Sequence, residues 1–271
     1  MKPSSALSGF VKTASTLLIV VLVAINPAVA QNATPAASQK SAPIPRMADG
    51  HPDLSGIWWT GGDLGSPGYG SSNKAAGTGS SGPKVASFTD LYQPWAAEHA
   101  KTLKDKNDPT LQCKPTAFGT LSVRLFDVGA LGQIIAKPGM MVFLQETFHG
   151  YQLIPTDGRA HRPVPASFRG DAVGHWEGDT FVVETKNFTD DTWIFAEGRV
   201  SFHSDQLRVL ERYTRTDAKT LVVEATVYDP KVLTAPWVVP KQTLTLSPDD
   251  QLLPLICTGV ETQALMDAAQ K

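Results

Sequence analysis

The residues best suited to acid–base chemistry lie in an alternating segment in the second half of the chain. Over residues 207–214, one set of alternate positions carries Leu207, Val209, Glu211 and Tyr213. Side chains of a strand alternate between its two faces, so Glu211 is predicted to point into an apolar interior. Burial raises the pKa of an unpaired carboxyl group, which suits a general acid or base. An ion pair between Glu211 and an arginine at the rim of the fold is the structural alternative.

A second group of candidate residues lies in the turn at residues 157–163. Asp157 and Gly158 are ordinary turn residues. Arg159 and His161 share one face of an extended segment, where the guanidinium could hold an anionic or carbonyl oxygen while the imidazole moves a proton. The predicted catalytic group therefore comprises Glu211, His161, Arg159 and Asp157, and a solvated charged turn is the structural alternative.

Aromatic side chains and one histidine are the candidates for contact with substrate. Trp176, Tyr213 and Trp237 could line a cavity for a flat or apolar molecule, although core packing explains them equally well. His203 precedes the turn that leads toward Glu211, and a satisfied surface histidine is the alternative there. The sequence has no histidine spacing typical of metal sites, no nucleophile elbow and no glycine-rich nucleotide loop, so neither a metal nor a cofactor is expected.

Short segments joined by tight turns must position these residues. The strands predicted from alternation and turn signals are residues 140–146, 151–155, 174–176, 180–185, 199–203, 207–214, 220–228, 242–246 and 252–257. This spacing predicts a mostly β fold, an antiparallel meander whose edges would be hidden by closure into a barrel. A small closed barrel often keeps a cavity for one apolar ligand. A two-sheet sandwich and a cone-shaped α+β fold are the alternatives.

One short helical region is predicted before the strands, at residues 87–106. Ser87 and Asp90 have the spacing of a capping box. Pro94 is expected to break the segment and to start its second helix. Apolar side chains predicted to share one face are Phe88, Leu91 and Trp95.

The first thirty residues have the layout of a secretory signal peptide. A positively charged opening precedes an apolar run at 17–25 and small residues at 28–30, and a retained N-terminal anchor is the alternative. Residues 31–46 are interpreted as a flexible leader and 47–271 as a single β domain. Within it, the Gly/Ser-rich stretch 61–84 is a solvated loop or, alternatively, a lid over a pocket.

Export would remove two lysines, Lys2 and Lys12, and leave 22 basic and 26 acidic residues of the 24 and 26 in the full chain. This mild negative charge has no electrostatic footprint for nucleic acid or anionic lipid. Cys113 and Cys257 would both reach an oxidising compartment, where a pair of thiols is more often a disulfide than a metal or redox site. We therefore predict a disulfide between them and a periplasmic or secreted location.

Several motifs together resemble a large family of exported bacterial proteins of uncharacterised activity. They are DGHPDLSGIW at 49–58, TDGRAH at 156–161, GHWEGDTFVVET at 174–185, ERY at 211–213, and DP at 229–230 followed by PW at 236–237. The resemblance covers most of the mature chain and implies a lipocalin-like barrel. His175 stands where similar sequences often have arginine, which weakens a catalytic role for that position.

The leading hypothesis is an exported β-barrel protein that acts on a small apolar or aromatic molecule as a cofactor-independent lyase, isomerase or hydratase. A non-catalytic carrier or sensor of such a ligand is the first alternative. An envelope domain that binds other proteins is the second. The small molecule is the expected partner, with no nucleic acid and no membrane after signal cleavage. The sequence does not specify the oligomeric state.

Overall fold

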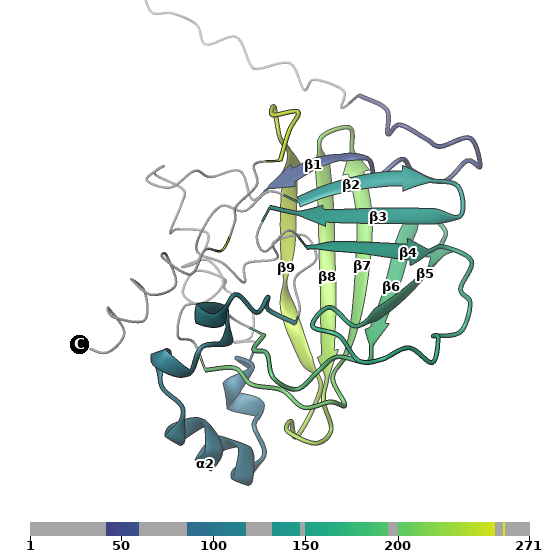
Figure 1. Cartoon of the computed structure of the whole chain (residues 1–271). Coiled ribbons are helices and arrows are strands. Elements are labelled where there is room, and N and C mark those ends of the chain that lie inside the picture. The colour runs from purple at the N-terminus through teal and green to yellow at the C-terminus, as the bar shows by residue number, and fades with distance from the viewer. Residues whose placement is uncertain are drawn as a thin grey trace, which may run out of the picture. The chain divides into compact units, whose positions relative to one another are not determined.

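Nine antiparallel strands form one sheet that is nearly closed into a barrel (Figure 1). A computed structural model describes residues 42–59, 86–117, 132–146, 150–194, 200–252 and 257. The strands are β1 Gly56–Trp59, β2 Gly132–Lys137, β3 Met140–Gln145, β4 Tyr151–Pro155, β5 Asp171–Glu177, β6 Thr180–Lys186, β7 Arg208–Asp217, β8 Thr220–Tyr228 and β9 Trp237–Leu246. The predicted antiparallel meander is therefore confirmed, and it is nearly closed into the predicted barrel.

The first and last strands along the chain, β1 and β9, pair with each other and join the two parts of the sheet. Hydrogen-bonded neighbours follow the order β4-β3-β2-β1-β9-β8-β7-β6-β5, so β1 pairs with both β2 and β9. In Figure 1, β2, β3 and β4 cross in front of β5 to β9 at a steep angle. The two remaining edges, β4 and β5, face each other as an unpaired seam.

All of the described residues belong to one compact unit, residues 41–271. The predicted signal peptide and the Gly/Ser-rich stretch 61–84 lie outside the described residues. No described helix is long and apolar enough to span a membrane.

Alternation of side chains defines the inner face of the barrel. On β7, Val209, Glu211, Tyr213 and Arg215 are buried, whereas Arg208, Leu210 and Arg212 point outward. Tyr213 meets Phe143 of β3 across the interior, with ring centroids 5.2 Å apart. Side chains therefore fill the barrel at this level, where the sequence allowed a ligand cavity.

Arg215 closes one end of the barrel. Its guanidinium donates to the backbone carbonyls of Asp53 and Ala218, and it lies over the ring of Trp58 at 5.1 Å. Trp58 itself donates from Nε1 to the carbonyl of Leu54 at 3.0 Å. The turn between β7 and β8 is thereby fixed to the segment that leads into β1.

The opposite end is covered by the helical region, which contains η1 Thr89–Leu91, α2 Pro94–Thr102, η2 Asp105–Asn107 and η3 Pro109–Gln112. The predicted capping box is confirmed by reciprocal bonds, Ser87 N to Asp90 Oδ2 at 3.0 Å and Asp90 N to Ser87 Oγ at 3.3 Å. Pro94 starts α2 as predicted.

The prediction that Trp95 shares the apolar face of this region with Phe88 and Leu91 is wrong. Trp95 is 48% exposed, and Ala96 is the buried residue of α2. The reason is the break after η1, because α2 restarts with a new rotation at Pro94 and does not continue the phase of Phe88.

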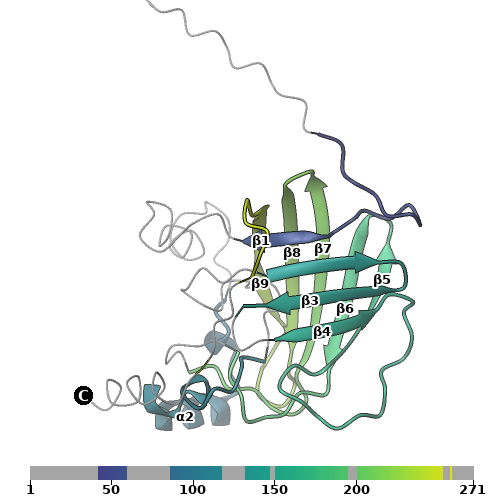
Figure 2. The ribbon, with the colours of Figure 1, turned by 45° about the horizontal axis from the view of Figure 1, so that its top comes forward.

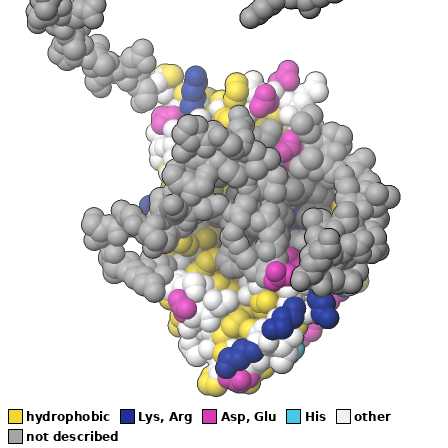
Figure 3. All heavy atoms as spheres, turned by 90° about the vertical axis from the view of Figure 1, so that its left-hand side faces the viewer, with side chains coloured by type: hydrophobic (Ala, Val, Ile, Leu, Met, Phe, Trp, Pro, Cys, Tyr) yellow, Lys and Arg dark blue, Asp and Glu magenta, His cyan; other side chains and the backbone are white. Residues whose placement is uncertain are grey.

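In Figure 3, hydrophobic side chains gather in the lower part of the face beside a row of Lys and Arg side chains.

Three predicted strands need correction or lie outside the described residues. Residues 200–203 are not a strand but make one isolated bridge, Phe202 with Trp193. The segment 242–246 is only the end of β9, which begins at Trp237 and continues through a register shift opposite β8. Most of 252–257 is outside the described residues. Strands β1 and β2 were not predicted.

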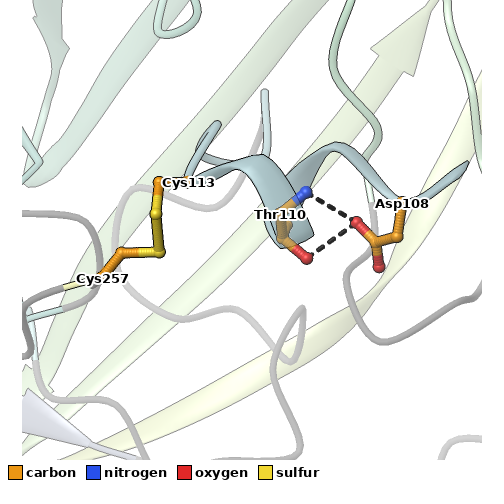
Figure 4. Close-up of a disulfide and its surroundings, with 4 residues drawn as sticks. All are labelled: Asp108, Thr110, Cys113 and Cys257. Carbon is orange, nitrogen blue, oxygen red and sulfur yellow. Dashed lines mark hydrogen bonds between the residues drawn. A yellow bond between two sulfur atoms is a disulfide. The ribbon is translucent and has the colours of Figure 1, made fainter. Parts of the chain in front are cut away.

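The predicted disulfide is present between Cys113 and Cys257 (Figure 4). Cys113 follows η3, and the start of η3 is capped by Asp108, whose Oδ1 accepts from N and Oγ1 of Thr110 at 2.8 and 2.7 Å. The bond therefore joins the helical region to the chain beyond β9.

Candidate functional site

Glu211 lies inside the barrel, as its alternation predicted. It is 2% exposed, and its Oε1 accepts a hydrogen bond from the hydroxyl of Tyr213 at 2.7 Å. Both residues also interact with groups beyond this bond. The neighbours of Glu211 on the paired strands are Val183 of β6 and Ala225 of β8, which place an apolar residue on each side of it.

His161 lies on the outer face of the same sheet. Its Nδ1 is 3.1 Å from Oδ2 of Asp171, and its Nε2 is 3.1 Å from Oε2 of Glu184. Register pairs Glu184 with Leu210 and Val183 with Glu211. Paired residues of antiparallel strands share a face and neighbours alternate, so Glu184 and Glu211 point to opposite sides. The sheet therefore separates His161 from Glu211.

The outer face carries a connected network of charged groups around His161. Arg162 forms an ion pair with Asp171 at 3.0 Å. Glu184 forms ion pairs with Lys186 and Arg208, each at 2.9 Å. Carboxylate oxygens only accept hydrogen bonds, so both imidazole contacts are hydrogen bonds when both ring nitrogens carry protons. Desolvation opposes ionisation of Glu184, but these cations outweigh it and lower its pKa to about 2.

Arg159 and Asp157 form a separate exposed pair in the same loop. Arg159 Nη2 lies 2.7 Å from Asp157 Oδ2, and both side chains are more than half exposed, at 54% and 53%. The hydrogen bond from Arg159 is the main reason that the pKa of Asp157 falls to about 2. The loop is held to β5 by a bond from Gly158 N to the carbonyl of Gly174 at 2.9 Å.

The four predicted catalytic residues are thus divided among three places. Glu211 is inside the barrel, His161 is in the outer charged network, and Arg159 with Asp157 is at an exposed turn. Period-two alternation determines the face of a strand residue, but it does not determine the face over which a connecting loop folds. This explains why Glu211 was placed correctly and the grouping was not.

The residues predicted to contact substrate are also dispersed. Trp176 stacks on His51 with centroids 4.5 Å apart, and it packs against Phe181. Trp237 is buried below the helical region, where its Nε1 donates to the carbonyl of Ala86 at 3.1 Å. Tyr213 lies within the barrel beside Glu211.

His203 is buried and has hydrogen-bond partners, so the alternative that it is a surface histidine is wrong. Its Nδ1 is 2.9 Å from the carbonyl of Ser204, which requires the proton on Nδ1, and its Nε2 accepts from the hydroxyl of Thr192 at 2.9 Å. Burial lowers the pKa of His203. Nearby, Asp229 accepts from both N and Oγ of Ser204 at 2.7 and 2.6 Å. This network holds the loop before β7 to the end of β8.

A pocket of about 510 Å³ opens beside this network, where β6, β7 and β8 meet the loop 229–236. Its lining residues include apolar side chains, two cations and one aromatic ring. They are Lys186, Asn187, Asp205, Gln206, Leu207, Arg208, Tyr228, Asp229, Pro230, Leu233, Thr234, Ala235 and Pro236. The guanidinium of Arg208 lies 3.7 Å from the centroid of the Tyr228 ring.

Sequence reasoning missed this pocket, although two signals for it were present. Alternation puts Arg208 on the face of its strand opposite to Glu211, and the 229–230 and 236–237 motifs bracket the loop that forms one wall. Neither signal identifies a pocket unless β6 is known to lie beside β7. The described residues contain no cluster of three side chains suited to a metal ion.

Comparison of the chain with protein-family models, with curated proteins and with solved structures finds no match.

Proposed function

We propose that this chain is an exported carrier or sensor that binds a small amphiphilic molecule in the pocket at the β6–β8 end of the barrel. The observation that carries the proposal is the pocket wall formed by the Arg208 guanidinium over the ring of Tyr228, beside Lys186 and apolar side chains. Export is supported by the disulfide and by the N-terminal leader. Membership of the exported family is likewise proposed on the sequence motifs.

The lining chemistry suggests the class of ligand. A volume of about 510 Å³ suits one molecule of ordinary cofactor or drug size. Pro230, Ala235 and Pro236 offer exposed apolar surface to a ring or short chain, and Lys186 and Arg208 offer donors to an acidic or carbonyl group. An aromatic or alicyclic molecule with one anionic group combines both requirements.

Binding without catalysis is favoured by the positions of the acid–base residues. The enzyme hypothesis requires Glu211, Arg159 and His161 to act on one substrate, whereas the sheet lies between the first and the third. The pocket is lined by groups that bind and orient a ligand. Its aspartate Asp229 is already engaged by Ser204.

The test uses 8-anilinonaphthalene-1-sulfonate, a fluorescent aromatic anion, as the probe. We expect saturable fluorescence enhancement with the folded protein and about tenfold weaker binding in Arg208→Gln, because the variant loses both the cation and the stacked wall. Arg212→Gln is the matched control, since Arg212 lies on the same face of β7 and is paired with Glu177 outside the pocket.

Far-UV circular dichroism verifies that each variant is folded. Equal affinity in Arg208→Gln and wild type, or an absence of saturable binding to the folded protein, would overturn the proposal. Equal weakening in both variants would assign the effect to net charge alone and would also contradict it.

A further inference from the structure

The seam between β4 and β5 is the one place in the described sheet where neighbouring edges are not joined by a strand ladder. Figure 2 shows the two strands at the same side of the barrel, linked by the long connection that follows β4. A side-chain bond crosses the seam, from Gln152 Nε2 to the carbonyl of Arg169 at 2.9 Å. Arg169 therefore stands at the opening, with its backbone tied to β4.

The Arg169 side chain turns toward the end of β3. A methyl group at Gly150 would lie 2.6 Å from Nη2 of Arg169 and 2.7 Å from Oε1 of Gln145. Gln145 is 8% exposed, so the guanidinium approaches a buried amide. The absence of a side chain at Gly150 is what leaves room for this approach.

Arg169 has an unusual position among the arginines of the described ranges. The residue as a whole is partly buried, and its Nε is shielded from solvent and makes no hydrogen bond. Other arginines have clear partners, such as Arg46 with Asp179 and Arg162 with Asp171. Burial lowers the pKa of Arg169 to about 10, so the guanidinium still carries its charge at neutral pH.

The backbone that presents Arg169 is rigid. Gly170 has a φ of +68° and donates from N to the carbonyl of Ser167 at 3.3 Å. Ser167 also exchanges backbone bonds with the chain after β6, donating to Asn187 O at 3.2 Å and accepting from Thr189 N at 3.0 Å. A guanidinium held in place before binding loses little freedom when a ligand arrives.

An N–H group that is shielded from solvent and has no acceptor is costly, and an anion that enters the seam would supply that acceptor beside the guanidinium charge. We propose that Arg169 is the recognition residue of an oxyanion site in the β4–β5 seam, which takes the carboxylate or phosphate group of a small molecule. The site is separate from the pocket described above, since Arg169 is not part of that pocket's wall. The proposed oxyanion site can therefore be tested independently of the proposed carrier function.

The experiment titrates the purified protein with sodium acetate and with inorganic phosphate, against sodium chloride at equal ionic strength. The readout is the side-chain Nε–Hε NMR signal of Arg169. We expect a saturable shift with a dissociation constant below about 1 mM for one of the two oxyanions. Preference for acetate identifies a carboxylate site, and preference for phosphate identifies a phosphate site.

Two variants locate the site by loss of binding, measured as stabilisation against heat by the preferred anion. Arg169→Gln should weaken binding about tenfold or more, because it removes charge-assisted hydrogen bonds. Gly150→Ala should weaken it as well, because the new methyl group occupies the space of Nη2 while Arg169 is retained. Arg162→Gln is the control, since Arg162 lies on the same connection and is paired with Asp171.

If no oxyanion shifts the wild-type signal beyond the chloride control, the proposal is wrong, and this result does not depend on any variant folding. Undiminished binding in Arg169→Gln would also overturn it. Loss of binding in Arg162→Gln alone would move the site to the outer charged network and contradict the assignment to Arg169.

Discussion

At the scale of single residues, Glu184 connects the two polar regions of the outer face. It accepts from His161 on one side, and on the other it pairs with Lys186 and Arg208, both of which line the pocket. One carboxylate therefore orients both cations of the proposed ligand site. Because Glu184 pairs with two cations and also contacts His161, its charge should matter to both stability and ligand affinity.

The pKa of Glu184 gives a pH-dependent prediction. Its pKa is lowered from 4.5 to about 2 in the folded chain, so its contribution to stability is complete above about pH 4.5 and is lost as pH falls toward 2. We expect Glu184→Gln to lower the free energy of unfolding by about 1 kcal/mol at pH 6, a modest value because the ion pairs are partly exposed to solvent. Urea denaturation at pH 6, 4, 3 and 2 should show the difference between variant and wild type shrinking with acid.

Glu98→Gln is the control for this series, because Glu98 is paired with Lys101 at an exposed position of α2. We expect it to change stability by less than about 0.5 kcal/mol throughout. A wild-type to Glu184→Gln difference that is constant from pH 6 to pH 2 would contradict the assigned role of the carboxylate.

The sequence was most informative about individual residues within long strands. The inward position of Glu211 followed from alternation alone, and the pairing of Cys113 with Cys257 followed from the compartment. The contacts of His161 could not be predicted in this way, because they depend on a fifteen-residue connection, 156–170, folding over the outer face. Arg169 had no sequence signal, since its approach to Gln145 depends on the absence of a side chain at Gly150.

At the scale of elements, strands with clean alternation beside a tight turn were predictable, and the others were not. Strands β7 and β8 are nine or ten residues with clean alternation, and their predicted bounds hold within a few residues. Strand β1 has only four residues, and its two central ones, Ile57 and Trp58, are both buried. Alternation cannot identify such a strand, so the closure of the barrel through β1 could be expected only in general terms.

Arg215 gives a prediction for the contact between the β7–β8 turn and the segment before β1. It fixes the β7–β8 turn to the segment before β1 through two carbonyl acceptors and Trp58, a geometry that needs the planar fork of a guanidinium. We expect Arg215→Lys to lower the free energy of unfolding by about 2 kcal/mol or more, because a buried ammonium cannot reach all three partners. Chemical denaturation measures this difference.

Arg212→Lys on the same strand is the comparison, because Arg212 is on the outer face and pairs with Glu177. It should change stability by less than about 0.5 kcal/mol. If the two variants prove equally stable, Arg215 does not secure that end of the barrel.

At the scale of the whole molecule, the disulfide encloses nearly the entire barrel. Cys113 and Cys257 are 144 residues apart, and strands β2 to β9 all lie between them. The unfolded chain is therefore restricted over most of its length. Both proposed sites lie inside this loop, so the bond should support them through stability rather than through contact.

Replacing both cysteines tests this view of the molecule. We expect Cys113→Ser with Cys257→Ser to lower the free energy of unfolding by about 2 to 5 kcal/mol, because the loss of so long a loop constraint restores freedom to the unfolded chain. Urea denaturation of the double variant and of oxidised wild type measures the loss, and the reduced, alkylated wild type should match the variant. Since the crosslink touches neither the pocket nor the seam, the double variant should bind the fluorescent anion with wild-type affinity while it remains folded. A large loss of affinity in the folded double variant would show instead that the disulfide shapes the binding surface directly.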